Sequence, residues 1–390
     1  MNAGCASRAR RTGPVAAVPI PLTRGAMSDG PRASDPLIWL LTDDRPGNRT
    51  QAVGAARTVG WPTVEKRLAF NDRQTVATPR LGATLETLDT ASRASIVPPY
   101  PDLVIAAGRR AVPVAAWLRR EAGARVVLIG RRTPDGVADL TVRTAYLRQV
   151  PHPRLLELAL PLTQIDAERL AEARIAEPDP LEGLARPRVA FLVGGPTGQH
   201  DMSDAFAAGM AREVAAAAAD AGGGLAILTS RRTPASAVSA IRGAAPGARL
   251  IAWSPDATYN PYVATLANAD LLVVTGESES MLAEAVAAGL PLTIYPLVAR
   301  PLSAKARVRA GIASLALGHG PLAALCGRVM SEGWVAPRRD LVVMHRLIEE
   351  RGWGRVFDGR LNRESPLPHD ERRALGDRIR AVMAEGKATA

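Results

Sequence analysis

Cysteine, aromatic residues and long apolar runs are all scarce in this sequence, and each shortage limits what the protein can be. The 390 residues include two cysteines, Cys5 and Cys326, and five histidines without paired spacing. Neither a disulfide framework nor a bound metal is therefore expected, which fits a reducing compartment. Aromatic residues make up 4%, which suits alanine-rich helices packed closely on sheets. No apolar run reaches the ~18 residues that a membrane-spanning helix needs.

Lysine is almost absent, whereas arginine is abundant. Only three of the 49 basic residues are lysines, and the formal net charge is +11. No basic block with interleaved aromatic residues is present, so a nucleic-acid partner is not expected. A phosphate-bearing substrate or an anionic membrane surface accounts for the basic charge equally well. We expect a cytoplasmic protein, with peripheral attachment to the inner membrane as the open alternative.

Short apolar segments alternate with amphipathic ones from Pro36 onward, which predicts an α/β fold with two doubly wound, Rossmann-like domains facing a cleft. The predicted units are a disordered leader (1–35), two domains (36–178 and 186–335) and C-terminal helices (340–390). For the leader, a transit peptide and a true start at Met27 remain alternatives. The predicted strands are 37–42, 64–68, 103–107 and 126–130 in the first domain, and 189–193, 225–229, 250–253, 271–274 and 292–295 in the second. A linker rich in proline and charge is predicted at 176–188.

Residues 269–296 predict a compact strand–helix–strand unit. A polar bend, Thr275–Glu279, joins the strand Leu271–Val274 to an amphipathic helix, Ser280–Ala288. The amino end of a helix after a parallel strand presents unpaired N–H groups and a favourable dipole to phosphate. We therefore expect a nucleotide diphosphate here. The residues expected to hold it are Thr275, Gly276, Ser278 and Ser280, with Glu284 one turn further along for the ribose hydroxyls.

Two other loops follow predicted strands of the second domain. Gly194-Gly195, with Thr197 close behind, allows backbone to approach a ligand, although the loop matches neither the dinucleotide nor the P-loop pattern. Arg231 and Arg232 precede a helix and are placed to grip a diphosphate. The plainer interpretations are a turn that returns the chain and a solvated pair of charges.

The bend also comes within one residue of the G-x-S-x-G pattern of serine hydrolases. In that interpretation Ser278 is the nucleophile, and the base is His319, His345 or His369. Ser280 stands where the strained turn needs the smallest residue, which argues against this alternative.

Taken together, these segments resemble the Elm-type mitochondrial-fission family, which also includes bacterial glycosyltransferases. The first half carries the resemblance in Leu41-Thr42-Asp43, in Pro46-Gly47 with Gln51, and in 101–105. The second half carries it in 194–196, 229–234, Asn260-Pro261-Tyr262 and 274–281, the last ending at Met281. More distantly, Glu284-Ala285 with Gly289 and Pro291 is similar to the glycosyltransferases that act on lipid-linked cell-wall intermediates.

The resemblance implies a GT-B-like architecture, with an acceptor at the first domain and a nucleotide-sugar donor at the second. It adds Asn260, Tyr262 and Met281 to the expected donor site. Such transfer needs no metal or cofactor, since positioning and electrostatics supply most of the catalysis. Asp43 is the expected base and His200 the second choice, while sugar and acceptor stay undefined.

Departures from the family pattern leave other functions open. Asn48 stands where the family often has histidine, and Glu277 where it prefers aspartate. A non-catalytic interaction protein that retains the fold is therefore the main alternative. A nucleotide-sugar epimerase is a lesser one, because the G-x-x-G-x-x-G turn and the Tyr-x-x-x-Lys pair are both missing.

Overall fold

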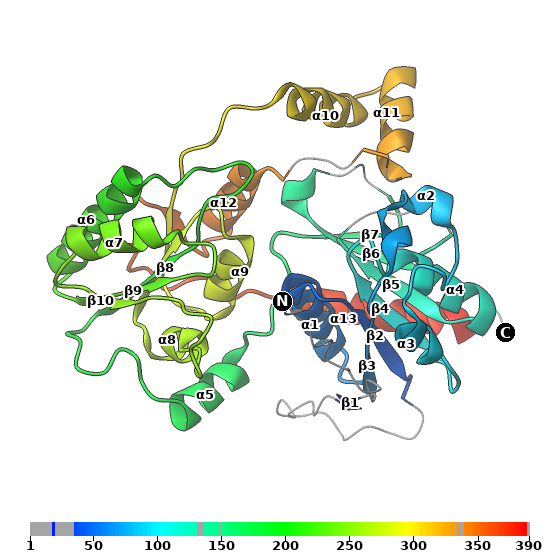
Figure 1. Ribbon diagram of the computed structural model, residues 1–390, viewed down its shortest axis with the longest axis horizontal. Helices are drawn as coiled ribbons and strands as arrows, with labels where there is room; N and C mark the ends of the chain where they lie inside the picture. The colour runs from blue at the N-terminus through cyan, green and yellow to red at the C-terminus, as the bar shows by residue number, and fades with distance from the viewer. Residues whose placement is uncertain are drawn as a thin grey trace, which may run out of the picture.

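The computed structural model describes residues 18–19, 35–130, 136–148, 150, 152–332, 334–335 and 339–387. Two α/β lobes lie side by side, each built on its own sheet (Figure 1). Apart from residues 18–19 and 35, the predicted leader lies outside the described residues.

The first sheet has the strand order β1-β3-β2-β4-β5-β6-β7, in which β2 to β7 are parallel and β1 is an antiparallel edge strand. The strands are β1 (Val18–Pro19), β2 (Ile38–Thr42), β3 (Thr63–Arg67), β4 (Leu103–Ala107), β5 (Arg125–Ile129), β6 (Leu140–Thr144) and β7 (Leu155–Leu158). The helices of this part are α1 (Pro46–Arg57), η1 (Asp72–Thr75), α2 (Thr78–Leu81), α3 (Thr90–Ala94), α4 (Val112–Ala122) and η2 (Ala145–Leu147). Strands β2 and β4 are buried along their whole length, as expected for a parallel sheet covered on both faces.

The second sheet has the order β10-β9-β8-β11-β12-β13, all parallel. Its strands are β8 (Arg188–Val193), β9 (Gly224–Thr229), β10 (Arg249–Ile251), β11 (Leu271–Thr275), β12 (Leu292–Tyr295) and β13 (Arg355–Val356). Its helices are α5 (Ala167–Ala176), α6 (Asp204–Asp220), α7 (Ala235–Ala244), α8 (Tyr262–Asn268), α9 (Glu279–Ala287) and α12 (Leu341–Glu350). The prediction of two Rossmann-like domains is confirmed.

The chain passes between the lobes at positions that differ from the predicted linker. On α5, Leu170 and Ala173 share a core with Leu192 and Leu228 of the second sheet, so α5 already packs on the second lobe. The crossing therefore precedes α5, and residues 176–188 connect two elements of the same lobe. After α12 and β13 the chain returns to the first lobe.

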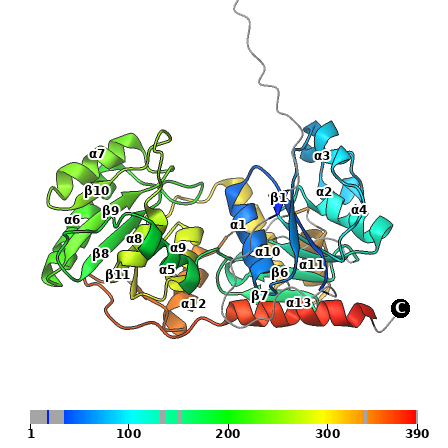
Figure 2. The ribbon, with the colours of Figure 1, turned by 90° about the horizontal axis from the view of Figure 1, so that it is seen from below.

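Helix α13 (Glu371–Lys387) runs under the first sheet (Figure 2). Its apolar face, formed by Leu375, Ile379 and Val382, is buried in the core of the first lobe with Val53 and Ile105. The first lobe therefore covers the apolar face of this C-terminal helix.

Two further helices, α10 (Ala304–Ala316) and α11 (Pro321–Ser331), follow β12 and lie at one edge of the molecule, outside both sheets (Figure 1). The chain leaves the second lobe, reaches the first lobe at α11, where Cys326 and Met330 pack with Val150, and returns to α12.

Candidate functional site

The carboxyl ends of β8 and β11 are held together by hydrogen bonds from the glycine loop to the bend after β11. Gly194 N donates to Thr275 Oγ1 at 2.8 Å, and Gly195 N donates to Glu277 Oε1 at 2.8 Å. The Glu277 side chain is 0% exposed. The prediction that these two amides face a pyrophosphate is therefore wrong, because side chains of the bend already occupy them.

Close packing explains why both loop positions are glycine. A Cβ at Gly194 would lie 1.8 Å from Glu277 Oε1, and one at Gly195 would lie 2.3 Å from the Arg232 carbonyl oxygen. The glycines thus allow three loops to meet at the edge of the sheet.

Glu277 is a carboxylate enclosed by protein. Burial raises its pKa, although bonds from the Gly195 amide and the charge of Arg232 act in the opposite direction. Arg232 Nη2 lies 3.5 Å from Oε1, and Oε2 is buried without a hydrogen-bond partner among the described residues. A buried charge without full compensation favours its neutral form.

The amino end of α9 remains available to a ligand. Ser278 is buried and makes no capping hydrogen bond to the helix; its Oγ accepts from Arg232 Nη2 at 3.3 Å. Ser280 is exposed and Met281 is half-buried, so the first turn of the helix reaches the surface. Arg231 is also exposed. Uncapped N–H groups at a helix start favour an anion.

Glu284 is bound to a neighbouring helix. Its Oε2 accepts a hydrogen bond of 2.6 Å from the Tyr262 hydroxyl, and burial raises the pKa of both groups. Asn260 Oδ1 accepts from Tyr262 N at 3.2 Å. These three predicted donor-site residues are thus brought together, with the carboxylate engaged by the phenol.

His200 and Thr197 form a local turn away from the other predicted residues. Thr197 Oγ1 accepts from the amides of Gln199 and His200 at 3.1 Å. His200 lines a hollow of about 280 Å³ beneath α10 with Leu317 and Arg339.

The described residues do not pair Ser278 with a histidine. His345 Nε2 lies 2.7 Å from the Gly276 carbonyl oxygen, and its ring packs against Gly276. His369 contacts Glu371, and His319 is exposed. This arrangement disfavours the serine-hydrolase alternative.

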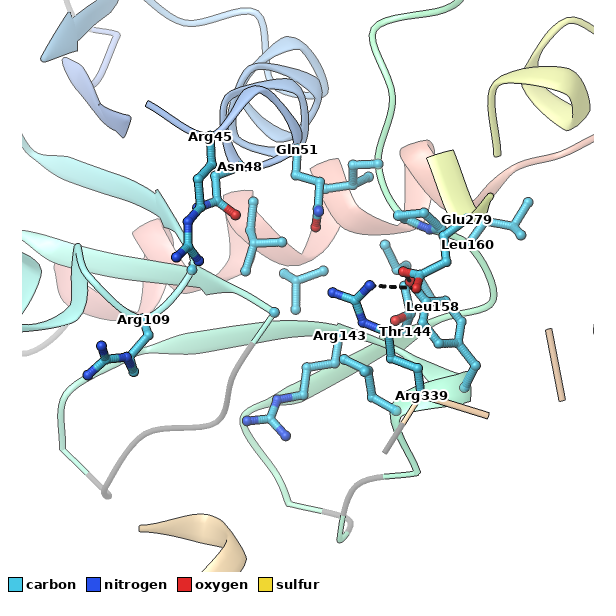
Figure 3. Close-up of a pocket in the computed structure, with 18 residues that line it drawn as sticks. Arg45, Asn48, Gln51, Arg109, Arg143, Thr144, Leu158, Leu160, Glu279 and Arg339 are labelled. Carbon is cyan, nitrogen blue, oxygen red and sulfur yellow. Dashed lines mark hydrogen bonds and ion pairs between the residues drawn. The ribbon is translucent and has the colours of Figure 1, made fainter. Parts of the chain in front are cut away.

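A cavity of about 270 Å³ lies between the lobes, at the carboxyl edge of the first sheet (Figure 3). Four arginines contribute to its lining: Arg45, Arg109, Arg143 and Arg339. Polar residues that also line it are Asn48, Gln51, Thr144, Tyr146 and Glu279. Glu279 comes from α9, so the second lobe closes one side of a cavity built mainly by the first.

Glu279 is the only acidic residue among the described residues that line this cavity. Its Oε2 accepts from the Tyr146 hydroxyl at 2.6 Å, and its Oε1 accepts from Arg339 Nη1 at 2.8 Å (Figure 3). Burial and this carboxylate raise the pKa of Tyr146 well above its usual range. Tyr146 therefore acts as a hydrogen-bond donor that orients Glu279.

Asp43 lies behind the cavity wall. Its Oδ1 accepts from Arg45 N at 3.1 Å, and Asn48 Nδ2 donates to both of its carboxylate oxygens at 3.0 and 3.2 Å. Asn48 in turn packs against Gly108, where φ is +82° and an added Cβ would lie 2.6 Å from Nδ2. These contacts make Asp43 an organiser of the loop before α1, and the described lining of the cavity reaches Asn48 but not Asp43.

Sequence reasoning missed Tyr146, Arg143 and Arg339, and placed Glu279 only at the end of the polar bend. Arg143 stands in β6, a strand that the apolar pattern did not reveal, and it is only 3% exposed. An arginine in a short segment of apolar and threonine residues is the sequence signal that could have indicated this cavity.

The sequence profile described as mitochondrial fission ELM1 matches residues 46–319. None of the curated proteins compared with the chain matches it. Among solved structures, the chain is similar to a UDP-glucosyltransferase from Polygonum tinctorium, with 12% identity, 91% of this chain and 94% of that chain covered, and a TM-score of 0.42. It is also similar to a UDP-N-acetylglucosamine 2-epimerase from Rickettsia bellii, with 11% identity, coverage of 90% and 96%, and a TM-score of 0.43.

Proposed function

Because the chain belongs to the mitochondrial fission ELM1 family, and because its two Rossmann-like lobes enclose a polar cavity, we propose that it is a glycosyltransferase. It moves a sugar from a nucleotide diphosphate to an acceptor hydroxyl. The observation that carries the proposal is the position of Glu279, on the first turn of α9 in the second lobe and in the wall of the cavity of the first lobe.

The donor diphosphate binds at the start of α9. Since the amides of Gly194 and Gly195 are occupied, the phosphate oxygens accept from the first-turn N–H groups near Ser280 and Met281. Arg231, exposed at the end of β9, supplies a guanidinium for the same charge. Thr275, Gly276 and Ser278 shape the bend that places this helix end.

The acceptor occupies the cavity, which is lined by four arginines and by Glu279. The acceptor oxygen attacks the anomeric carbon and forms the new glycosidic bond as the bond to the diphosphate oxygen breaks. The nucleoside diphosphate leaves with that electron pair, and the acceptor proton passes to the Glu279 carboxylate. Asp43 holds Asn48 and the loop before α1 in place for this step.

Calorimetry with UDP-, GDP- and CMP-sugars, followed by an assay for nucleotide release, tests the proposal. We expect one donor class to bind, and Glu279→Gln to lower turnover by at least 100-fold while donor affinity changes less than threefold. Glu121→Gln is the matched control, because Glu121 pairs with Arg120 on the surface of α4. Absence of donor binding, or full turnover in Glu279→Gln, would refute the assignment.

The second candidate is a non-catalytic interaction protein that retains a nucleotide pocket. Two observations favour it: the occupied amides of Gly194 and Gly195, and Asn48 at the position where the family often has histidine. Donor binding without nucleotide release, in the presence of a broad set of acceptors, would support this candidate over the first.

A further inference from the structure

Helices α10 and α11 expose an unusual amount of apolar surface. Of the fourteen exposed large hydrophobic side chains among the described residues, seven lie within 298–334. They are Val298 (59% exposed), Val308 (64%), Leu315 (48%), Leu317 (38%), Leu322 (57%), Leu325 (58%) and Trp334 (48%). Contiguous exposed apolar surface marks a binding surface more often than an accident of packing.

The exposed apolar residues follow the helical repeat. Val308 and Leu315 are seven residues apart on α10, and Leu322 and Leu325 are three apart on α11, so each pair lies on one face. Cys326 and Met330 of α11 pack inward. Each helix therefore has a defined outward face.

The charge of this segment has one sign. No aspartate or glutamate occurs between residues 285 and 331, whereas Arg300, Lys305, Arg307, Arg309 and Arg328 do. All but Arg300, which pairs with Asp201 at 3.0 Å, are exposed and without an ion pair among the described residues. An apolar face bordered only by cations matches an anionic lipid surface. There the apolar side chains pack among the acyl chains, and the cations bind the anionic headgroups.

Among the described residues, no single helix is long and apolar enough to cross a membrane. Helices α10 and α11 reach the required hydropathy only as a pair, bent by 118° between them. Their place at the edge of the molecule, outside both sheets, leaves their outward faces open (Figure 1).

We propose that α10 and α11 dock this protein on an anionic lipid bilayer, with Val308, Leu315, Leu322 and Leu325 inserted at the level of the headgroups. The same docking places the interdomain cavity near the lipid surface. Arg339 lines both the hollow beneath α10 and the interdomain cavity, so the two are adjacent. Docking itself does not depend on the proposed sugar transfer, and its test uses no sugar.

The test is co-sedimentation of the full chain with phosphatidylcholine vesicles, with and without 30% phosphatidylglycerol. We expect at least tenfold tighter binding to the anionic vesicles, weakened by 0.5 M salt. We expect two variants each to bind the anionic vesicles at least tenfold more weakly: Leu322→Glu/Leu325→Glu and Lys305→Glu/Arg307→Glu/Arg309→Glu. Circular dichroism melts check that both variants stay folded.

Matched controls separate docking from the overall positive charge. Ile175→Glu/Leu367→Glu changes two side chains that are 88% and 62% exposed elsewhere, and Arg212→Glu/Arg242→Glu changes two exposed cations of α6 and α7. We expect these controls to bind within twofold of the unchanged protein. Equal losses of affinity in the controls, equal binding to neutral vesicles, or unchanged lipid binding in the α10 and α11 variants would overturn the proposal.

Discussion

The bond between Gly195 and Glu277 gives a quantitative test of how the bend after β11 is built. Replacing Glu277 with alanine leaves a buried N–H without an acceptor, which costs about 1–3 kcal/mol. Loss of the one buried γ-methylene group adds roughly 0.8 kcal/mol. Removal of a poorly compensated charge offsets part of this. We expect Glu277→Ala to lower the free energy of unfolding by about 1–3 kcal/mol at pH 7.

Glu277→Gln separates the hydrogen bond from the charge. Glutamine keeps the volume and can still accept from Gly195 N, so its free energy of unfolding at pH 7 is expected to be within about 1 kcal/mol of the unchanged protein, or higher. Urea denaturation of the three proteins provides the comparison. An equal decrease in the free energy of unfolding of the alanine and glutamine variants would show that the hydrogen bond from Gly195 N contributes nothing to stability.

The raised pKa of Glu277 fixes the direction in which folding stability changes with pH. Burial raises the pKa of Glu277 above its usual 4.5, so the folded state binds this proton more tightly than the unfolded state. The stabilisation of the folded state by this proton is complete below pH 4.5. It is lost as the pH rises through the raised pKa of Glu277, by at most about 1.4 kcal/mol per pH unit. Relative to Glu277→Gln, the unchanged protein should therefore weaken as the pH rises above 4.5. A constant difference across pH 4.5–8 would contradict the burial of an uncompensated carboxylate.

Three further substitutions address other contacts. Gly195→Ala forces a Cβ to 2.3 Å from the Arg232 carbonyl oxygen, so urea denaturation should show a free energy of unfolding lower by about 1–3 kcal/mol. An unchanged free energy of unfolding would show that the backbone is not packed this closely at Gly195. Tyr146→Phe removes the donor to Glu279 and should cost about 1.5–3 kcal/mol, unless that hydrogen bond is absent in solution. Burial lowers the pKa of His345, so stability should fall as the pH drops through and below 6.5, and His345→Gln should abolish that dependence.

The fold was predictable because its strands are buried on both faces. Continuous apolar runs such as 103–107 and 292–295 have nearly one interpretation when polar turns and amphipathic segments separate them. Strand β6 was not predicted because Arg143 and two threonines interrupt its apolar pattern, although every residue of it is buried. Helix α1 begins at Pro46, because proline is compatible with the first position of a helix.

The candidate site was predictable only in part, because local pattern does not tell which way a side chain turns. The strand–bend–helix order of 271–287 is local, and it was found. The contact of Glu277 with Gly195 joins residues 82 apart, and the contact of Tyr146 with Glu279 joins residues 133 apart. Such pairs depend on how two sheets and two lobes are placed, which no periodicity in one segment specifies.

These contacts together move the expected diphosphate site by about one turn of helix. On both sides of Gly276 the structure places buried groups whose pKa shifts favour neutrality, Glu277 with a raised pKa and His345 with a lowered one. The bend between β11 and α9 is thus filled by its own side chains and carries little charge. The open N–H groups that a diphosphate needs lie further along, at the uncapped start of α9. Glu279 lies on that turn, so the same geometry that closes the bend brings the proposed donor end of the second lobe against the cavity of the first.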